Sequence, residues 1–230
     1  MFGQKKIAII VAEFLGAAIL SIALYTILAR TSFPLFTGAA VGVSFALLTM
    51  IFGEVSGGHF NPAVTLANWS RNRVTTTHAI VNIAAQFLGG FAAWGLIRYF
   101  MGHNLASLAG TKFAWSVFIA EAIGTAVFTF GIGAAVYMNV KGAQFASAVG
   151  LSLFLGVLVA SLGSNGILNP AVALGVQSWD WAYATAPLVG GIVGFNLYAF
   201  IFADDWSKFA KKKPAKVAVK RPATKKKTRR

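Results

Sequence analysis

The chain of 230 residues contains no cysteine and only six acidic residues. The lack of cysteine excludes disulfides and thiolate metal sites. Charged residues make up 11% of the sequence, whereas hydrophobic residues make up 57%. A soluble domain of this size needs far more charge to cover its surface. The composition therefore excludes an ordinary soluble globular protein and indicates membrane-spanning segments.

Six apolar runs are long enough to cross a bilayer, which takes about 20 helical residues. They cover roughly 7–29, 36–53, 78–100, 113–137, 145–163 and 182–202. The first run is long enough to remain as a span, so we expect no cleaved signal peptide. Two further apolar segments, near 61–69 and 169–178, are too short to cross alone. Such half-helices can enter a bilayer only where their ends are buried in protein or line a wet cavity.

The tripeptide Asn-Pro-Ala opens both short segments, at an offset of 108 residues. Its six residues are Asn61, Pro62, Ala63, Asn169, Pro170 and Ala171. The same offset relates Ala12-Glu13 to Ala120-Glu121, Gly16 to Gly124 and Val41-Gly42 to Val149-Gly150. Several unrelated residue types repeating at one offset indicate a duplication, with repeats of about 7–100 and 113–202. Matching broken helices in two repeats point to one solute site at the repeat interface.

Positive charge is distributed unevenly along the chain. Seventeen of the 20 Lys and Arg residues fall on one side of the predicted spans, 12 of them within 208–230. We therefore expect both termini to be cytoplasmic. With three spans per repeat, the second repeat is inverted, and the two half-helices enter from opposite faces. We expect a channel domain over 1–206 and a disordered basic tail over 207–230.

The basic tail suits attraction to anionic lipid headgroups near the bilayer surface. A solvated tail without a specific partner is an equal alternative. Nucleic-acid binding is not expected, because no aromatic residue interleaves the basic ones after Phe209.

In each motif, Asn suits a helix N-cap and Pro suits the first helical position. A single Asn-Pro-Ala is most often an ordinary helix start. Here the motif is duplicated beside membrane spans, so two helix N-termini are expected to face each other in mid-membrane. Both positive ends repel a cation, whereas a neutral solute passes. The amides of Asn61 and Asn169 can donate hydrogen bonds to its oxygen.

Glu13 and Glu121 lie within predicted spans and are related by the repeat. Intramembrane carboxylates are costly and suggest a function. We expect each to accept hydrogen bonds from the irregular backbone that leads into a half-helix; proton coupling in a transporter is the alternative. Gly57 and Gly58 precede His59 and suit a backbone that lines a path. His59 is more often a packed histidine than a ligand, and no cysteine or second histidine nearby suggests a metal.

Taken together, these motifs resemble the aquaporin family of major intrinsic proteins. The resemblance extends over nearly the whole chain to about residue 203 and is carried by Ala12–Gly16, Ser56–Thr65, Ala85–Gly89, Glu121 with Gly124-Thr125, Asn169–Ala171, and Pro187 with Gly190-Gly191. It implies an all-α membrane protein with six transmembrane helices, two re-entrant half-helices and one pore per subunit. It also implies passive flow of water or small neutral solutes, a homotetramer, and no cofactor. We expect the protein in the cell membrane, and we expect no enzymatic activity because the sequence shows no nucleophile–base set or metal cluster.

One departure concerns the outer selectivity filter of the family. The resemblance places this filter at Val41, Val157, Gly166 and Val172, where Val172 takes the place of the usual Arg. These residues carry neither charge nor a side-chain hydrogen-bonding group. We expect a wider and more apolar constriction than a water filter, with weak discrimination between water, glycerol, urea and ammonia.

Two other functions remain open from the sequence. Inverted repeats with broken helices also build coupled secondary transporters. A membrane-anchored scaffold that acts through its basic tail is the other possibility.

Overall fold

A computed structural model of the chain describes residues 4–31, 33–103, 106–107, 109–110 and 112–203. The predicted basic tail, 207–230, lies outside the described residues. The described helices are α1 (Gln4–Leu28), α2 (Pro34–Ser56), α3 (Pro62–Ser70), α4 (Thr76–Met101), α5 (Trp115–Tyr137), α6 (Gly142–Ala160), α7 (Pro170–Gly175) and α8 (Trp181–Phe202).

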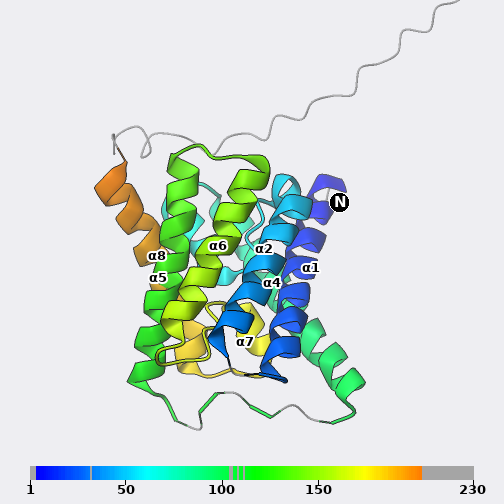
Figure 1. Cartoon of the computed structure of the whole chain (residues 1–230). Coiled ribbons are helices and arrows are strands. Elements are labelled where there is room, and N and C mark those ends of the chain that lie inside the picture. Colours follow the sequence, from blue (N-terminus) through cyan, green and yellow to red (C-terminus); the bar gives the residue numbers. More distant parts are fainter. Residues whose placement is uncertain (1–3, 32, 104–105, 108, 111, 204–230) are drawn as a thin grey trace, which may run out of the picture.

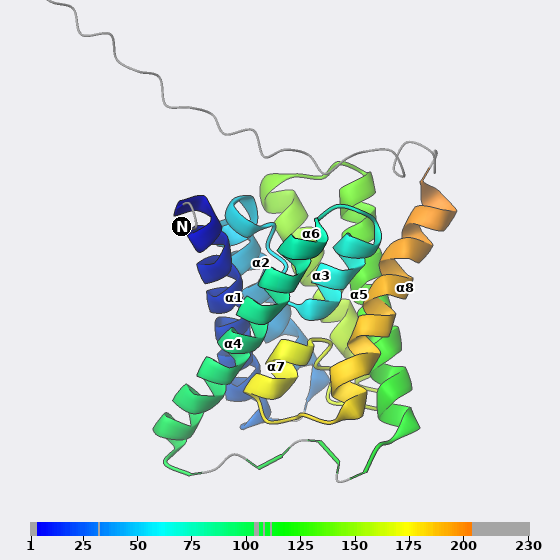
Figure 2. The ribbon, with the colours of Figure 1, turned by 180° about the vertical axis from the view of Figure 1, so that it is seen from behind.

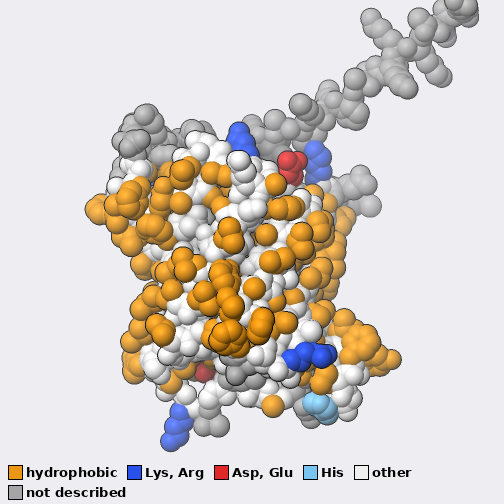
Figure 3. Space-filling view, viewed as in Figure 1, with side chains coloured by type: hydrophobic (Ala, Val, Ile, Leu, Met, Phe, Trp, Pro, Cys, Tyr) orange, Lys and Arg blue, Asp and Glu red, His pale blue; other side chains and the backbone are white. Residues whose placement is uncertain are grey.

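Six of these helices are long and apolar enough to cross a membrane, namely α1, α2, α4, α5, α6 and α8. They stand side by side as one bundle, with the start of α1 and the end of α8 at the same end of the molecule (Figure 1). Apolar side chains cover the middle of the visible surface, and charged side chains gather at its two ends (Figure 3). The predicted all-α fold is confirmed, with helix boundaries a few residues from those expected.

The two short helices, α3 and α7, lie in opposite halves of the bundle (Figure 2). α3 closely matches the predicted segment 61–69, but α7 ends at Gly175 rather than near 178. The reason is local: Gln177 adopts a positive φ of 56°, and the Ser178 N–H turns back to the Ala173 carbonyl. A left-handed residue followed by such a bond ends a helix.

Small residues allow the repeats to pack closely. A Cβ on Gly42 would lie 2.7 Å from the Gly150 carbonyl oxygen, and a Cβ on Gly150 would overlap the Gly42 carbonyl. The repeated Val-Gly pair is therefore the point where α2 crosses α6. Glycines elsewhere bring the long helices against the short ones: a Cβ on Gly90 would overlap the Ala171 carbonyl of α7, and one on Gly191 would lie 2.7 Å from the Ala63 carbonyl of α3.

Candidate conduction pathway

Both Asn-Pro-Ala motifs form the starts of short helices. The Asn61 Oδ1 accepts from the Ala63 N–H at 2.8 Å. The Asn169 Oδ1 accepts from the N–H groups of Ala171 and Val172 at 3.1 and 3.3 Å. Pro follows as the first helical residue in both cases, where its missing N–H costs no hydrogen bond.

The two motifs also bind each other across the repeat interface. The Asn61 Nδ2 donates to the Leu168 carbonyl at 2.8 Å, and the Asn169 Nδ2 donates to the Phe60 carbonyl at 3.0 Å. An amide nitrogen carries two N–H groups. Each asparagine therefore keeps one N–H beyond this cross-link, and the two helix starts are fixed head to head.

The residue before each motif is a bulky side chain in the left-handed conformation. Phe60 has a φ of 48° and Leu168 a φ of 56°, and both side chains are completely buried. This conformation is an outlier for bulky residues and needs support from its surroundings. It turns each carbonyl toward the asparagine of the opposite motif, which explains why the strained backbone recurs in both repeats.

The support comes from the two buried carboxylates. Glu13 accepts from the N–H groups of His59 and Phe60 at 3.0 and 2.7 Å. Glu121 accepts from the N–H groups of Ile167 and Leu168 at 2.9 and 2.7 Å. Both glutamates are fully buried, so these charge-assisted bonds are well shielded from water.

A serine completes each of these carboxylate sites. Ser56 donates to Glu13 at 2.6 Å, and Ser164 donates to Glu121 at 2.7 Å. Each hydroxyl in turn accepts an N–H two residues on, from Gly58 and Gly166. Neither serine was predicted from the sequence to have a role, although their spacing is the same 108-residue offset that relates the motifs.

The first site has additional polar contacts. Gln86 on α4 donates to Glu13 at 2.6 Å and to the Thr65 hydroxyl at 2.9 Å. The His59 Nδ1 lies 3.2 Å from the same hydroxyl. His59 is thus a buried, hydrogen-bonded histidine that helps to hold the segment before α3.

A narrow cavity of about 20 Å³ borders the two asparagines. That volume corresponds to about one water molecule. Three of the four expected filter residues line it, namely Val41, Gly166 and Val172. Val157 is not in its lining and is completely buried; its carbonyl accepts the Ser161 hydroxyl.

The small filter residues do not line this cavity alone. Larger apolar side chains from the long helices and the segment before α7 share its wall: Leu20, Leu24, Phe45, Leu153 and Ile167. Phe45 is held in place by ring contacts to Phe60 and Phe128, with centroids 5.5 Å apart in both pairs. Sequence reasoning missed this wall, because apolar residues on spanning helices carry no signal that separates pore from core.

On the other side of the asparagines lies a wide vestibule of about 790 Å³, at the end of the molecule where α1 begins. Its wall contains Gly57, Gly58 and His59, together with Glu54, Asn68 and Arg73. Gly57 and Gly58 have positive φ values of 95° and 67°, which glycine adopts without strain. Both hollows border the first re-entrant segment, the narrow cavity at Asn61 and the vestibule at His59 and Val64, and together they outline a candidate path through the bundle.

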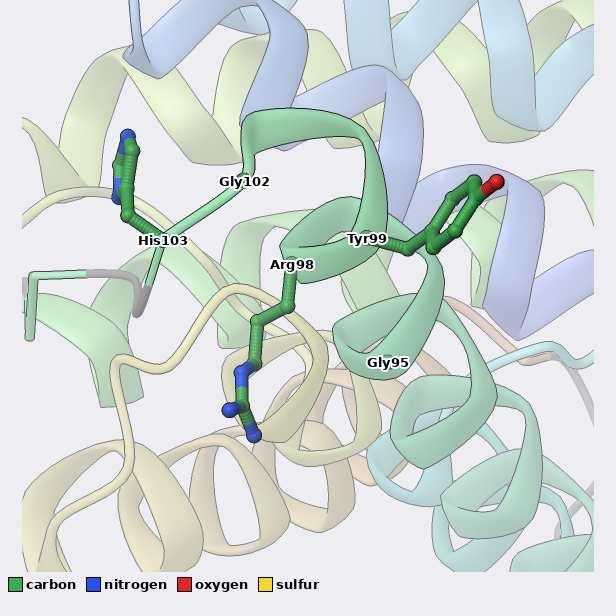
Figure 4. A pocket seen from close by; sticks show the side chains of 5 residues that line it. All are labelled: Gly95, Arg98, Tyr99, Gly102 and His103. Atoms are coloured by element: carbon green, nitrogen blue, oxygen red, sulfur yellow. The ribbon is translucent and has the colours of Figure 1, made fainter.

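A separate hollow of about 600 Å³ lies at the far end of α4 (Figure 4). It is lined by Gly95, Arg98, Tyr99, Gly102 and His103. The Arg98 guanidinium lies over the Trp94 ring, 4.8 Å from its centroid. None of these lining residues belongs to the re-entrant segments, so this hollow is not part of the path.

Within the described part of the chain, no group of three or more His, Asp or Glu residues is placed to hold a metal ion. The chemistry that remains along the path is hydrogen bonding by amides and backbone groups within apolar walls.

Comparisons with known proteins agree on one family. Residues 4–202 match the family described as Major intrinsic protein. Aquaporin Z of Photorhabdus laumondii is 31% identical over 194 residues, covering 74% of this chain and 84% of the relative. Glycerol uptake facilitator protein-like 6 of Lactiplantibacillus plantarum is 32% identical over 199 residues, covering 79% and 92%. Aquaporin-4 of Bos taurus is 30% identical over 179 residues, covering 71% of this chain and 55% of its own length.

Among solved structures, the aquaglyceroporin from Plasmodium falciparum matches with a TM-score of 0.69. The match covers 85% of this chain and 96% of that chain at 20% identity. At this identity the match concerns the fold alone.

Proposed function

The chain belongs to the major intrinsic protein family, and from this premise we propose that it conducts water and small uncharged solutes between Asn61 and Asn169. The resemblance found in the sequence is thereby confirmed. The chain is a multi-pass integral membrane protein and a channel for water or small solutes, not an enzyme. The solutes and the path through the two motifs are the proposal.

The observation that carries the proposal is the reciprocal bonding of the two motifs. Asn61 and Asn169 fix each other's helix starts through the Leu168 and Phe60 carbonyls. Both asparagines border the same narrow cavity. A solute in this cavity meets amide N–H donors on one side and apolar side chains elsewhere, so it can slide past with one or two hydrogen bonds.

The apolar wall explains why the solute should be uncharged. The described lining of the narrow cavity consists of apolar residues, the glycine and the two asparagines. An ion that leaves water for such a wall loses its hydration without compensation. Water, ammonia, urea and glycerol lose much less, and small filter residues do not orient any one of them.

Stopped-flow measurements on proteoliposomes test the proposal with water, glycerol, urea and ammonia in one preparation. We expect water flux well above that of empty vesicles, and flux of at least one of the other solutes. Flux of water alone would contradict the account of the constriction. Absence of any flux would contradict the channel proposal itself.

The same preparation distinguishes the two other functions. Flux through a channel does not saturate with solute concentration and does not respond to ion gradients. Flux through a coupled transporter saturates and responds to the gradient of the coupled ion. A scaffold that acts through its tail gives no flux with or without residues 208–230. The channel proposal expects truncation of that segment to leave flux unchanged.

We further propose a homotetramer in the cell membrane with both termini cytoplasmic. The start of α1 and the end of α8 lie at one end of the bundle (Figure 1), which supports a common side for the termini. The flanks of the long helices expose apolar side chains such as Val43, Leu47, Phe91 and Ile123, which suit contact with lipid or with a second copy. Cross-linking in membranes and protease protection of the ends test these assignments.

A further inference from the structure

The charged side chains of the candidate path are concentrated at one end. The described lining of the narrow cavity contains none, whereas that of the vestibule contains Lys5, Glu54 and Arg73. All three side chains are exposed. Arg73 differs from the other two because it is hydrogen-bonded to the re-entrant helix α3.

Two hydrogen bonds tie Arg73 to α3. Its backbone N–H donates to the Asn68 carbonyl at 3.0 Å, and its Nε donates to the Asn68 Oδ1, also at 3.0 Å. Asn68 is itself buried and donates from Nδ2 to the Val64 carbonyl at 3.0 Å. The guanidinium is therefore held against the helix whose other end carries Asn61.

The Arg73 charge is not neutralised by the part of the chain that the structure describes. No carboxylate oxygen there lies within 4.0 Å of its guanidinium nitrogens. Glu54, the carboxylate of this wall, makes no ion pair with Arg73, and His59 and His78 cannot supply a negative charge. A fixed guanidinium without a carboxylate repels cations that enter the vestibule.

The described lining of the narrow cavity has no cationic side chain, so a cation there meets only the two helix starts and the loss of its hydration. Val172, where the resemblance leads one to expect a cationic side chain, is apolar and buried. We propose that Arg73 is a specificity-determining residue, the fixed positive charge that excludes cations at the vestibule. This inference rests on the proposed channel function.

The test compares Arg73→Gln with wild type in proteoliposomes of the full chain. Gln removes the charge and can still donate to Asn68. We expect potassium and sodium leak to rise about threefold at low ionic strength, as removal of a unit charge about 5 Å away allows in a water-like dielectric, and less at high salt. Water permeability of the same vesicles should stay within about twofold, because the narrow cavity is unchanged. Arg73→Lys keeps the charge and should retain cation exclusion.

Arg71→Gln is the matched control. Arg71 lies two residues away, does not line the vestibule, and donates from Nε to the Tyr137 hydroxyl. The Arg71→Gln substitution removes the same charge from the same loop, and we expect it to add no cation leak. An equal rise in Arg71→Gln, or no rise in Arg73→Gln, would overturn the inference.

Loss of the channel function and a different role for Arg73 give different results. If the chain is not a channel, wild-type vesicles show no more water flux than empty vesicles. If only Arg73 has been misassigned, water flux persists and the cation leak of Arg73→Gln equals that of wild type.

Discussion

The side-chain amide of Asn61 donates a 2.8 Å hydrogen bond to the backbone carbonyl of Leu168, the residue before the second motif. Asn169 returns the same bond to Phe60. Neither re-entrant segment can therefore move without breaking a bond to the other. The two re-entrant segments therefore form one hydrogen-bonded unit at the centre of the bundle. A substitution that displaces one segment should also displace the other.

Substitution of Glu121 tests whether its carboxylate supports the re-entrant segment of the second repeat. Glu121→Gln leaves one oxygen where three donors converge, from Ser164, Ile167 and Leu168. The new NH₂ group of Gln is itself a donor, so it would face at least one of these donors without an acceptor between them. We expect the free energy of unfolding to fall by about 2–3 kcal/mol, and water flux to fall because Leu168 no longer presents its carbonyl to Asn61.

Thermal unfolding in detergent and stopped-flow water flux measure these two effects. Glu54→Gln serves as the control, because Glu54 is exposed at the vestibule. It should leave stability and water flux near wild type. Equal behaviour of the two variants would mean that Glu121 does not support the second re-entrant segment.

The contact between α4 and α7 depends on Gly90. A Cβ at this position would overlap the Ala171 carbonyl of the second motif, which belongs to the backbone and cannot rotate away. Gly90→Val should therefore lower the free energy of unfolding by about 2–3 kcal/mol and impair conduction.

Gly95 provides the comparison on the same helix. A Cβ there would meet no heavy atom within 4 Å, so Gly95→Val should change stability by no more than about 0.5 kcal/mol. Thermal unfolding of the pair, together with water flux, decides whether close approach of α4 to α7 is required. A neutral Gly90→Val would show that the short helix can shift without loss.

Asn82 is a buried amide on α4 whose environment does not match its chemistry. Its side chain is completely buried, and neither Nδ2 nor Oδ1 has a hydrogen-bond partner among the described residues. An unsatisfied buried amide costs roughly 1–3 kcal/mol. Asn82→Leu, which is similar in size and apolar, should therefore raise the midpoint of thermal unfolding. A lower midpoint would show that the amide makes a stabilising interaction in the membrane.

The sequence was a good guide wherever a feature occurred twice. The duplication at 108 residues predicted that Asn61 and Asn169 face each other and that Glu13 and Glu121 play matching parts. Apolar run length predicted six spans, because crossing a bilayer fixes a minimum length. Helix ends differed from the predicted ones where a local backbone turn ends the helix, as at Gln177 after α7.

The sequence was a poor guide to the larger side chains along the path. Val41, Gly166 and Val172 share the wall of the narrow cavity with Leu20 on α1 and with Phe45, which lies on α2 like Val41. Pore width depends on side chains that converge from several elements, and spacing along the chain does not encode that convergence. The attachment of Arg73 to Asn68 was hidden for the same reason, since Arg73 counted only as one more cytoplasmic charge.

Val172 is the position at which selectivity should respond most directly. It is buried in the wall of the narrow cavity beside Asn169. Val172→Arg adds bulk and a positive charge there, so glycerol and urea flux should fall toward that of empty vesicles while some water flux remains. Stopped-flow measurement with the four solutes checks this, and an unchanged solute profile would place the filter elsewhere.

Val172→Leu separates bulk from charge at the same position. It should reduce flux of the larger solutes but leave cation leak unchanged. In the Arg73→Gln background, Val172→Arg should restore cation exclusion that Val172→Leu cannot restore, because only the arginine returns a fixed positive charge to the path. If Val172→Leu restored exclusion equally well, steric closure rather than charge would govern cation leak, and the assignment of that role to Arg73 would be wrong.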